Sequence, residues 1–574
     1  MACEDVILSE DYADFIFQNT ISETIPFFQG VECIQNLDEV YRTEYVPLES
    51  LLGGRSAQPQ NGFYLLAGLP LLQVPYYSVP KLYGLMDRSS MEASRITDVQ
   101  NQPALSLTGG GVLVGLIDTG IDWSLPIFQK PSGKTRIVSL WDQAETEGEP
   151  PDGFSYGREY TQDDINLAII GQGEVPKDPL GHGTFLAGIA AGSEDVEQDF
   201  IGAAPNADIA VVKLKEAKRY LREYFQIPLD VPAFQENDVM AGAVYLHRLA
   251  TVRRQPLVLC IGIGSNQGSH SGVGPLQEVL SRIAKLPQHV VCVAGGNESG
   301  RSSHYFGRID AQETEETVEL RVDARDKGFT MEFWARSPEL YTISLQSPTG
   351  ETISNIPGRL ARSQLYSFVF EETKVIVDYA LAEPLSGNFM LQFRFQNPTP
   401  GIWKITASNS LFVYGGFHIW LPIKAFMSGE TIFLKSNPDT TLSEPGNAAW
   451  VLTVAGYQHR DGSLYLNSGR GYTSTDIVKP YITAPAVEVY GPEGDGIYGY
   501  RTGTSIAAAH AAGASALLLE WAVIRRNSVN MNTGEAATYL IRGARRVPGR
   551  EYPNREWGFG ILDLYRTFEV LATI

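Results

Sequence analysis

Three short segments, far apart in the chain, carry the residue types needed for acyl transfer. An apolar run ends in Asp118, the tripeptide Gly-His182-Gly opens a stretch rich in Gly and Ala, and Gly-Thr-Ser505 opens another. A serine hydroxyl becomes a nucleophile when a histidine removes its proton, and a carboxylate can orient that histidine and stabilise its charged form. We therefore expect Ser505 to act as the nucleophile, His182 as general base and then acid, and Asp118 as the partner of His182.

Each of these residues also has an ordinary structural explanation when it is taken alone. Asp118 could cap the turn after its strand, His182 could be a structural histidine, and Ser505 could be a helix N-cap. The other histidines receive the structural interpretation and no catalytic role: His247, His270, His289, His304, His418, His459 and His510. The order Asp, His, Ser, in surroundings that suit each role, favours the chemical interpretation of the first three.

Continuous apolar runs of strand length place these residues in a parallel sheet. Such runs indicate strands buried on both faces between helices, and an Asp at the carboxyl end of one lies where open α/β sheets have their clefts. The predicted strands are Val112–Ile117, Ile209–Val212, Leu257–Ile261, Val290–Ala294 and Ala449–Val454. The predicted helices are Gly183–Gly192, Asp238–Leu249, Pro275–Ala284 and Thr504–Ile524. Ser505 would then lie in the first turn of a long helix, whose positive end suits an oxyanion.

A region of alternating polar and apolar residues separates two parts of this α/β pattern. Between about 307 and 435, short alternating segments separated by Pro, Gly and Asn predict an antiparallel β-sandwich or jelly roll. Its predicted strands are 317–323, 341–345, 374–379, 389–395, 403–406, 417–421 and 431–434. We therefore expect an acidic α+β segment over 1–86, a catalytic α/β domain in two parts over 87–306 and 436–574, and an inserted sandwich over 307–435.

Together the three segments resemble those of the subtilisin-like serine proteases. The chain has Val114-Gly-Leu-Ile-Asp118-Thr-Gly, His182-Gly-Thr and Gly-Thr-Ser505-Ile-Ala, which match the motifs of that family in order and context. The resemblance implies a triad of Asp118, His182 and Ser505, in a subtilisin-like parallel sheet between helices. It covers about 87–306 and 436–574.

The resemblance also implies further site residues. Asn297, in Val-Ala-Gly-Gly-Asn297, would be the side-chain donor of the oxyanion hole, beside the Ser505 N–H. Residues on two strands would bind an extended peptide and wall the pocket for the residue before the cleaved bond (P1). These substrate-binding residues are Gly262, Ile263, Gly264, Ala294 and Gly295.

A narrower resemblance is to the clostridial Csp germination proteases, in the N-terminal segment, the intact triad and the insertion. It implies a prodomain over 1–86 that is cut by the enzyme itself and stays bound as an inhibitor. The extended, apolar stretch before Met86 predicts cleavage between Met86 and Asp87, with Gln100-Asn101 as an alternative junction. The implied substrate is a precursor of a spore-cortex hydrolase.

Two alternatives remain open at this stage. The chain could be a silent pseudoprotease that binds partners or senses signals, although all three triad residues and Asn297 are present. It could also be a general cytosolic protease with the same chemistry. Cleavage of casein compared with cleavage of a cortex-hydrolase precursor separates a general protease from a dedicated one.

Composition excludes several other classes. A net charge of −21 argues against binding of nucleic acid, whose phosphates would be repelled. The N-terminus has no secretory pattern and no segment reads as a membrane span, so we expect synthesis in the cytosol, with association with the spore as a further possibility. We expect no cofactor and no metal, because the acidic loop 193–199 lacks a calcium-loop pattern. We expect Cys3, Cys33, Cys260 and Cys292 to be free thiols, since they are spread singly.

Overall fold

The computed structural model describes residues 12–18, 31–36, 41–47, 89–310, 312–357, 364–409, 411 and 413–573. The chain divides into two compact units, Met1–Met86 and Asp87–Ile574. In the first unit the described residues form an antiparallel sheet in the order β1-β3-β2, with β1 at Tyr12–Gln18, β2 at Cys33–Asn36 and β3 at Tyr41–Pro47. Cys33 is disulfide-bonded. The free-thiol prediction is therefore wrong for Cys33, because spacing along the chain does not show which segments meet in space.

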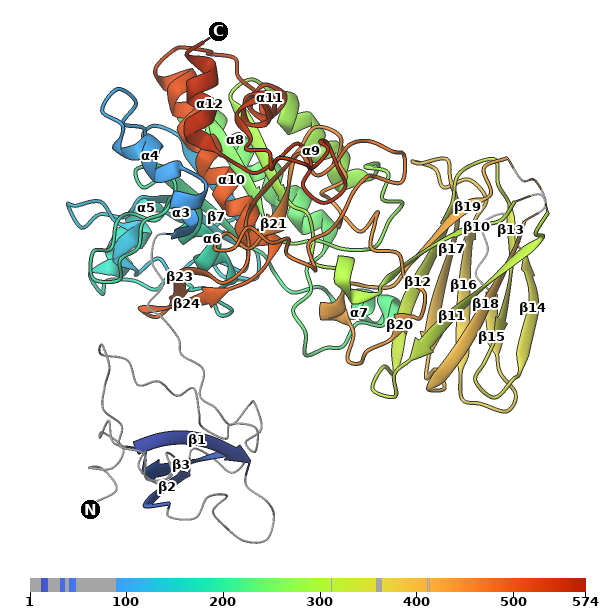
Figure 1. Ribbon diagram of the computed structural model, residues 1–574. Helices are drawn as coiled ribbons and strands as arrows, with labels where there is room; N and C mark the ends of the chain where they lie inside the picture. The colour runs from blue at the N-terminus through green and yellow to red at the C-terminus, as the bar shows by residue number, and fades with distance from the viewer. Residues whose placement is uncertain are drawn as a thin grey trace. The chain divides into compact units, whose positions relative to one another are not determined.

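An eight-stranded sheet forms the centre of the second unit (Figure 1), in the order β22-β21-β9-β8-β4-β7-β5-β6. All neighbouring strands are parallel except the edge pair β5 and β6. The strands are β4 Leu113–Asp118, β5 Ile137–Asp142, β6 Arg158–Thr161, β7 Asp208–Lys213, β8 Leu257–Ile261, β9 His289–Ala294, β21 Leu452–Tyr457 and β22 Ile482–Pro485. The predicted parallel sheet is confirmed. The last predicted core strand is shifted, because Ala449 and Trp450 lie in the turn before β21.

Alternate residues of each central strand enter two separate cores, which is why these strands read as continuous apolar runs. In β4, Val114 and Leu116 pack with α6 (His182–Ala191) and α10 (Thr504–Leu519), whereas Leu113 and Ile117 pack with α8 (Glu236–Arg253) and α9 (Pro275–Lys285). The four predicted helices are these four, within a few residues at each end. The other α-helices among the described residues of this unit are α3 Ser89–Ala93, α4 Ile96–Asn101, α5 Gln162–Ile169, α7 Arg219–Phe225, α11 Thr533–Gly543 and α12 Leu564–Leu571.

The predicted insertion is an antiparallel sandwich of a six-stranded and a five-stranded sheet around its own apolar core. The six-stranded sheet contains β10 His304–Arg308, β12 Gly328–Ala335, β15 Gln364–Ser367, β16 Lys374–Ala380, β17 Phe389–Gln396 and β19 Gly416–Trp420. The five-stranded sheet contains β11 Glu315–Val322, β13 Tyr341–Gln346, β14 Thr352–Pro357, β18 Gly401–Asn409 and β20 Ile432–Phe433. The first strand thus begins at His304, before the predicted boundary of 307.

The helix that carries Ser505 in its first turn is long and strongly apolar. Among the described residues, Thr504–Ile524 alone has the length and composition of a membrane-spanning helix, and 89% of its most apolar window is buried inside the protein. The α-helix α10 ends at Leu519 and continues as a π-helical turn over Glu520–Ile524. Its apolar character is therefore that of a core helix, packed against β8, β9 and β21.

Candidate active site

The three segments singled out in the sequence meet beside the carboxyl ends of the central strands of the sheet. Nδ1 of His182 donates to Asp118 Oδ1 over 2.7 Å, and Nε2 of His182 lies 3.2 Å from Ser505 Oγ. The structure thus brings Asp118, His182 and Ser505 into one hydrogen-bonded chain. Since a neutral imidazole carries one N–H, the bond to the carboxylate leaves Nε2 free to accept the serine proton.

Each side chain occupies the end of a regular element. Asp118 is the last residue of β4, His182 the first of α6, and Ser505 the second of α10. Asp118 is buried, and its Oδ1 also accepts from the Thr119 N–H over 2.8 Å. The carboxylate is therefore held in one orientation by its own backbone as well as by the histidine.

The environment of His182 favours proton transfer near neutrality. Burial lowers the pKa of His182, but the Asp118 carboxylate more than offsets this, so the pKa lies above its ordinary value. The charge of Arg501 acts against that rise, and Asp178 adds to it. The His182 side chain remains 32% exposed, so a substrate can reach it.

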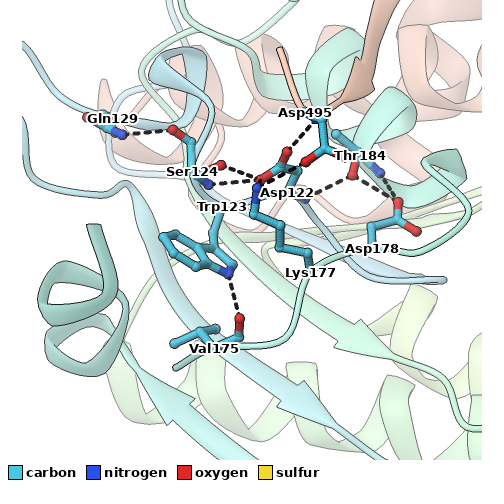
Figure 2. Close-up of polar contacts among 9 residues, drawn as sticks. All are labelled: Asp122, Trp123, Ser124, Gln129, Val175, Lys177, Asp178, Thr184 and Asp495. Atoms are coloured by element: carbon cyan, nitrogen blue, oxygen red, sulfur yellow. Dashed lines mark hydrogen bonds and ion pairs between the residues drawn. The ribbon is translucent and has the colours of Figure 1, made fainter. Parts of the chain in front are cut away.

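Polar contacts ahead of His182 fix the start of its helix (Figure 2). The Asp178 carboxylate accepts from the backbone N–H of Thr184 over 2.8 Å and from its hydroxyl over 2.9 Å. The Thr184 hydroxyl in turn accepts from the Asp122 N–H over 2.9 Å. The first turn of α6 is therefore tied to the loop that follows Asp118.

A second set of contacts reaches the hairpin that leads to Ser505, formed by β23 (Val489–Gly494) and β24 (Ile497–Arg501). The buried Asp122 carboxylate accepts from the Asp495 N–H at the hairpin tip over 2.7 Å and from the Ser124 hydroxyl over 2.6 Å. Lys177 Nζ lies 3.1 Å from Asp122 and 3.2 Å from Asp495. This group of contacts, seen in Figure 2, connects the loops of all three segments.

Asn297 lies three residues beyond β9 and is aimed by Thr504. Its Oδ1 accepts from the Thr504 N–H over 3.0 Å, and because that N–H can only donate, the Asn297 Nδ2 must point elsewhere. A Cβ placed on Gly503 would lie 3.2 Å from Ser505 Oγ and 3.7 Å from Asn297 Nδ2. The amide and the hydroxyl therefore face the same side of Gly503, where a tetrahedral oxyanion could accept from both Nδ2 and the Ser505 N–H.

The five predicted substrate-binding residues lie on two adjacent strand ends. Gly262, Ile263 and Gly264 follow β8, while Ala294 ends β9 and Gly295 follows it. Gly262 faces the triad itself, because its missing Cβ would lie 3.2 Å from both Asp118 Oδ2 and Ser505 Cβ. Gly264 is exposed and Ile263 half-buried, whereas Ala294 and Gly295 are buried.

Ser443 also lies at these strand ends, although no motif in the sequence includes it. A Cβ on Gly264 would lie 2.9 Å from Ser443 Cβ, and one on Gly296 would overlap the Ser443 hydroxyl. Ser443 therefore lies between the two strand ends. Nothing in its residue type marks it, because it reaches the site only through the return of the chain from the sandwich.

The sandwich contacts the loop that follows the Gly262–Gly264 segment. The Gly268 N–H donates to Glu332 on β12 over 2.9 Å, and the Asn266 side chain donates to the Leu421 carbonyl over 3.2 Å. His270 stacks on Trp420 of β19 with ring centroids 4.0 Å apart. The insertion is thus bonded directly to one wall of the candidate substrate cleft.

Metal-ligating side chains and free cysteines form no second candidate site among the described residues. Within the described ranges, no three His, Cys, Asp or Glu side chains are grouped to hold a metal ion. Cys260 and Cys292 are free and buried, as predicted, and burial raises the pKa of Cys292 to about 12, which keeps that thiol protonated. The predicted cleavage residues Met86 and Asp87 lie outside the described residues.

Comparison with known proteins agrees with this geometry. Residues 109–324 and 424–560 match the profile of the subtilase family. Among solved structures, the CspB protease of Clostridium perfringens is similar with a TM-score of 0.74 and 29% identity, over 84% of this chain and 97% of that one.

Two curated proteases match over shorter segments. An intracellular serine protease of Paenibacillus polymyxa is 34% identical over 106 residues, which is 18% of this chain. The membrane-bound transcription factor site-1 protease of Mus musculus is 34% identical over 178 residues, which is 30% of this chain. The matched segments span only 24% and 15% of those two relatives.

Proposed function

The chain belongs to the subtilase family and is a subtilisin-like serine protease, and from this premise we propose that it is an endopeptidase with Asp118, His182 and Ser505 as its catalytic triad. The observation that carries the proposal is the continuous bonding from Asp118 through His182 to Ser505. Its substrates are proteins or peptides, in keeping with the family.

The proposed reaction follows from which atoms can exchange a proton. His182 Nε2 accepts the proton of Ser505 Oγ as the oxygen attacks the peptide carbonyl, and Asp118 stabilises the imidazolium that forms. His182 then gives the proton to the leaving amine. A water molecule, deprotonated by His182, then attacks the carbonyl of the acyl-enzyme, and the carboxylic acid product leaves as Ser505 regains its proton.

Asn297 and the Ser505 N–H are proposed as the oxyanion hole. The support is the Thr504 N–H, which orients the Asn297 amide so that its donor is free toward Ser505. Gly262, Ile263, Gly264, Ala294 and Gly295 are proposed to bind the extended substrate, with Ser443 added between the strand ends. Backbone N–H and C=O groups of Ile263 and Gly264 would pair with the peptide as a further strand.

The Ser505→Ala variant tests the triad. It removes only the attacking oxygen from a buried position at the start of a helix, so we expect loss of casein cleavage with an unchanged fold and thermal unfolding midpoint. Labelling of the wild type, but not of the variant, by a serine-reactive fluorophosphonate would support the same assignment. Casein cleavage by Ser505→Ala at the wild-type rate would show that the triad is wrong.

Residues 1–86 are proposed to be a prodomain that the enzyme removes between Met86 and Asp87 and retains as an inhibitor. The support is sequence: the stretch before Met86 is apolar and extended in pattern, and a tethered peptide reaches the cleft at a high effective concentration. N-terminal sequencing of purified wild type and Ser505→Ala decides it. A new terminus at Asp87 in the wild type alone is expected, and an uncut chain in an active enzyme would contradict it.

The physiological substrate is proposed to be a precursor of a spore-cortex hydrolase. The support is the likeness to the CspB protease over nearly all of that chain, together with the inserted sandwich. Synthesis in the cytosol and association with the spore belong to the same proposal, and the likeness to an intracellular protease supports the first. Incubation with such a precursor and with casein tests it: a single cut in the precursor and slow casein cleavage are expected, whereas extensive casein cleavage alone favours the general protease.

A further inference from the structure

Arg501 lies directly beside the loop that leads into His182. Its Nη2 donates to the Leu180 carbonyl over 3.2 Å, and a Cβ on Gly181 would lie 2.9 Å from the same atom. The guanidinium carbon is 5.6 Å from the centroid of the buried Phe185 ring. Arg501 is thus packed against the residue before His182, close enough for its charge to lower the pKa of that histidine.

The guanidinium is available to a ligand. Its side chain is 27% exposed, and its nearest carboxylate, that of Glu493, lies 3.4 Å from Nε. Among the described residues, Arg501 Nη1 has no hydrogen-bond partner. Since the Arg501 guanidinium makes only one long ion pair and its Nη1 can still donate, it can bind a second carboxylate by displacing water.

The position of Arg501 corresponds to the leaving side of a bound peptide. The acyl half of the substrate must lie toward Asn297 and Gly264, because its carbonyl oxygen needs the oxyanion donors. The leaving amine takes its proton from His182 Nε2, so the residues after the cleaved bond must run past His182. Arg501 is the cation next to that path, at the end of the strand that leads to Ser505.

The hairpin keeps Arg501 in place. Its tip is bonded to Asp122 and Lys177, as Figure 2 shows, and the Glu493 carbonyl lies close against Gly181. Gly181 has a left-handed φ of 67° and no room for a side chain beside Arg501, so glycine suits this contact. The hairpin that ends in Arg501 is therefore fixed at its tip and at Glu493, and the Arg501 side chain is bonded to the Leu180 carbonyl, which limits the entropy lost when a ligand binds it.

We infer that Arg501 makes this protease select peptides with an acidic residue at the first or second position after the cleaved bond. The inference rests on the proposed function and narrows its substrate class. The proposed self-cleavage junction agrees with it, because Asp87 directly follows Met86. Arg501 is a specificity-determining residue here and takes no part in the proton transfers.

The experiment uses full-length protein and begins with cleavage sites mapped in denatured casein by mass spectrometry. The best-cut sequence is then synthesised with Asp, Asn or Lys at each of the two positions after the bond. We compare kcat/KM for the wild type, Arg501→Gln and Arg501→Glu, normalised to active sites by fluorophosphonate labelling. Arg460→Gln is the matched control, since the Arg460 side chain is also 27% exposed and also pairs with a glutamate, Glu488.

We expect the wild type and Arg460→Gln to cut the Asp peptide about fivefold faster than the Asn peptide at low salt, the upper end of the range for an exposed ion pair. Arg501→Gln should lose this preference, and Arg501→Glu should reverse it in favour of Lys. For the uncharged Asn peptide, the acid limb of kcat/KM should move to higher pH in Arg501→Gln, because a positive charge beside His182 has been removed.

Equal rates on all peptides in the wild type, with Ser505→Ala inactive, would overturn the inference and leave the proposed function standing. So would an acidic preference that survives Arg501→Gln. If the wild type and Ser505→Ala are equally inactive on casein, or equally active, the proposed function fails and this inference fails with it.

Discussion

His510 offers a test of how the core around Ser505 depends on pH. It lies in α10 five residues after Ser505 and is fully buried. Its Nδ1 donates to the Ile506 carbonyl over 2.9 Å, while its Nε2 is buried without a hydrogen-bond partner. Burial lowers the pKa of His510 to about 4 in the folded protein, so the native state holds this ring neutral.

The size of the effect follows from linkage. A histidine has a pKa of about 6.5 when unfolded, so between pH 6.5 and 4 the unfolded chain binds a proton that the folded one does not. The contribution of neutral His510 to the free energy of unfolding is therefore fully present above about pH 6.5, and it is lost as the pH decreases toward 4. Between pH 7.5 and pH 5 this one residue should remove about 2 kcal/mol from the free energy of unfolding.

The test compares the double variant Ser505→Ala/His510→Leu with Ser505→Ala alone, because the loss of the nucleophile prevents self-digestion. Urea unfolding followed by tryptophan fluorescence gives the free energy of unfolding at pH 7.5 and at pH 5. We expect the two proteins to be within about 1 kcal/mol at pH 7.5, because one local bond and one unsatisfied nitrogen are lost together. At pH 5 the leucine variant should have gained about 2 kcal/mol relative to its parent.

Other buried histidines titrate equally in both proteins and cancel in this difference. A gain below about 0.5 kcal/mol on going from pH 7.5 to pH 5 would refute the reasoning, since it would mean that His510 accepts a proton in the folded state without penalty.

Three further predictions concern the site itself. Gly262→Ala should lower both kcat and the unfolding midpoint, because its methyl would lie 3.2 Å from Ser505 Cβ and overlap the buried Leu186 side chain; an unchanged kcat in peptide assays would contradict the packing. Asn297→Asp keeps the acceptor for Thr504 but removes the donor, so kcat should fall about 10²–10³-fold, the loss known for such a donor in a subtilisin; full activity would exclude Asn297 from the oxyanion hole. Asp122→Asn should raise KM with little change in the thermal midpoint, since Lys177 loses its ion pair with Asp122 beside the hairpin tip; an unchanged KM, or a lowered midpoint in differential scanning calorimetry without a change in KM, would contradict this.

The candidate site could be predicted because its chemistry needs particular residue types in particular local settings. Asp118 ends a run that must be a buried strand, and His182 and Ser505 open apolar helices. These local signals do not depend on the rest of the fold. The hydrogen bonds that join the three side chains depend on the whole sheet, and in the sequence only the order of the motifs indicates them.

Residues that reach the site through distant packing could not be predicted in this way. Ser443 arrives on the return from the sandwich, and Arg501 acts by charge from a neighbouring strand. The sequence does not predict strand β12 for a related reason: seven of its eight residues are buried, so it lacks the alternation of exposed and buried residues that indicates β11. A residue such as Glu332 reads as solvent-facing in sequence, yet it is buried and accepts the Gly268 N–H.

That bond between Glu332 and Gly268 has a thermodynamic consequence. The loop over Asn266–Gly268 can be ordered from either side, by the sandwich through Glu332 and Leu421 or by a peptide seated on Gly264. The coupling between two such events is reciprocal. If contact with the sandwich increases the affinity for a peptide, a bound peptide stabilises the sandwich against unfolding by the same free energy. A bound substrate would thus stabilise residues 304–433 against unfolding, and its release would remove that stabilisation.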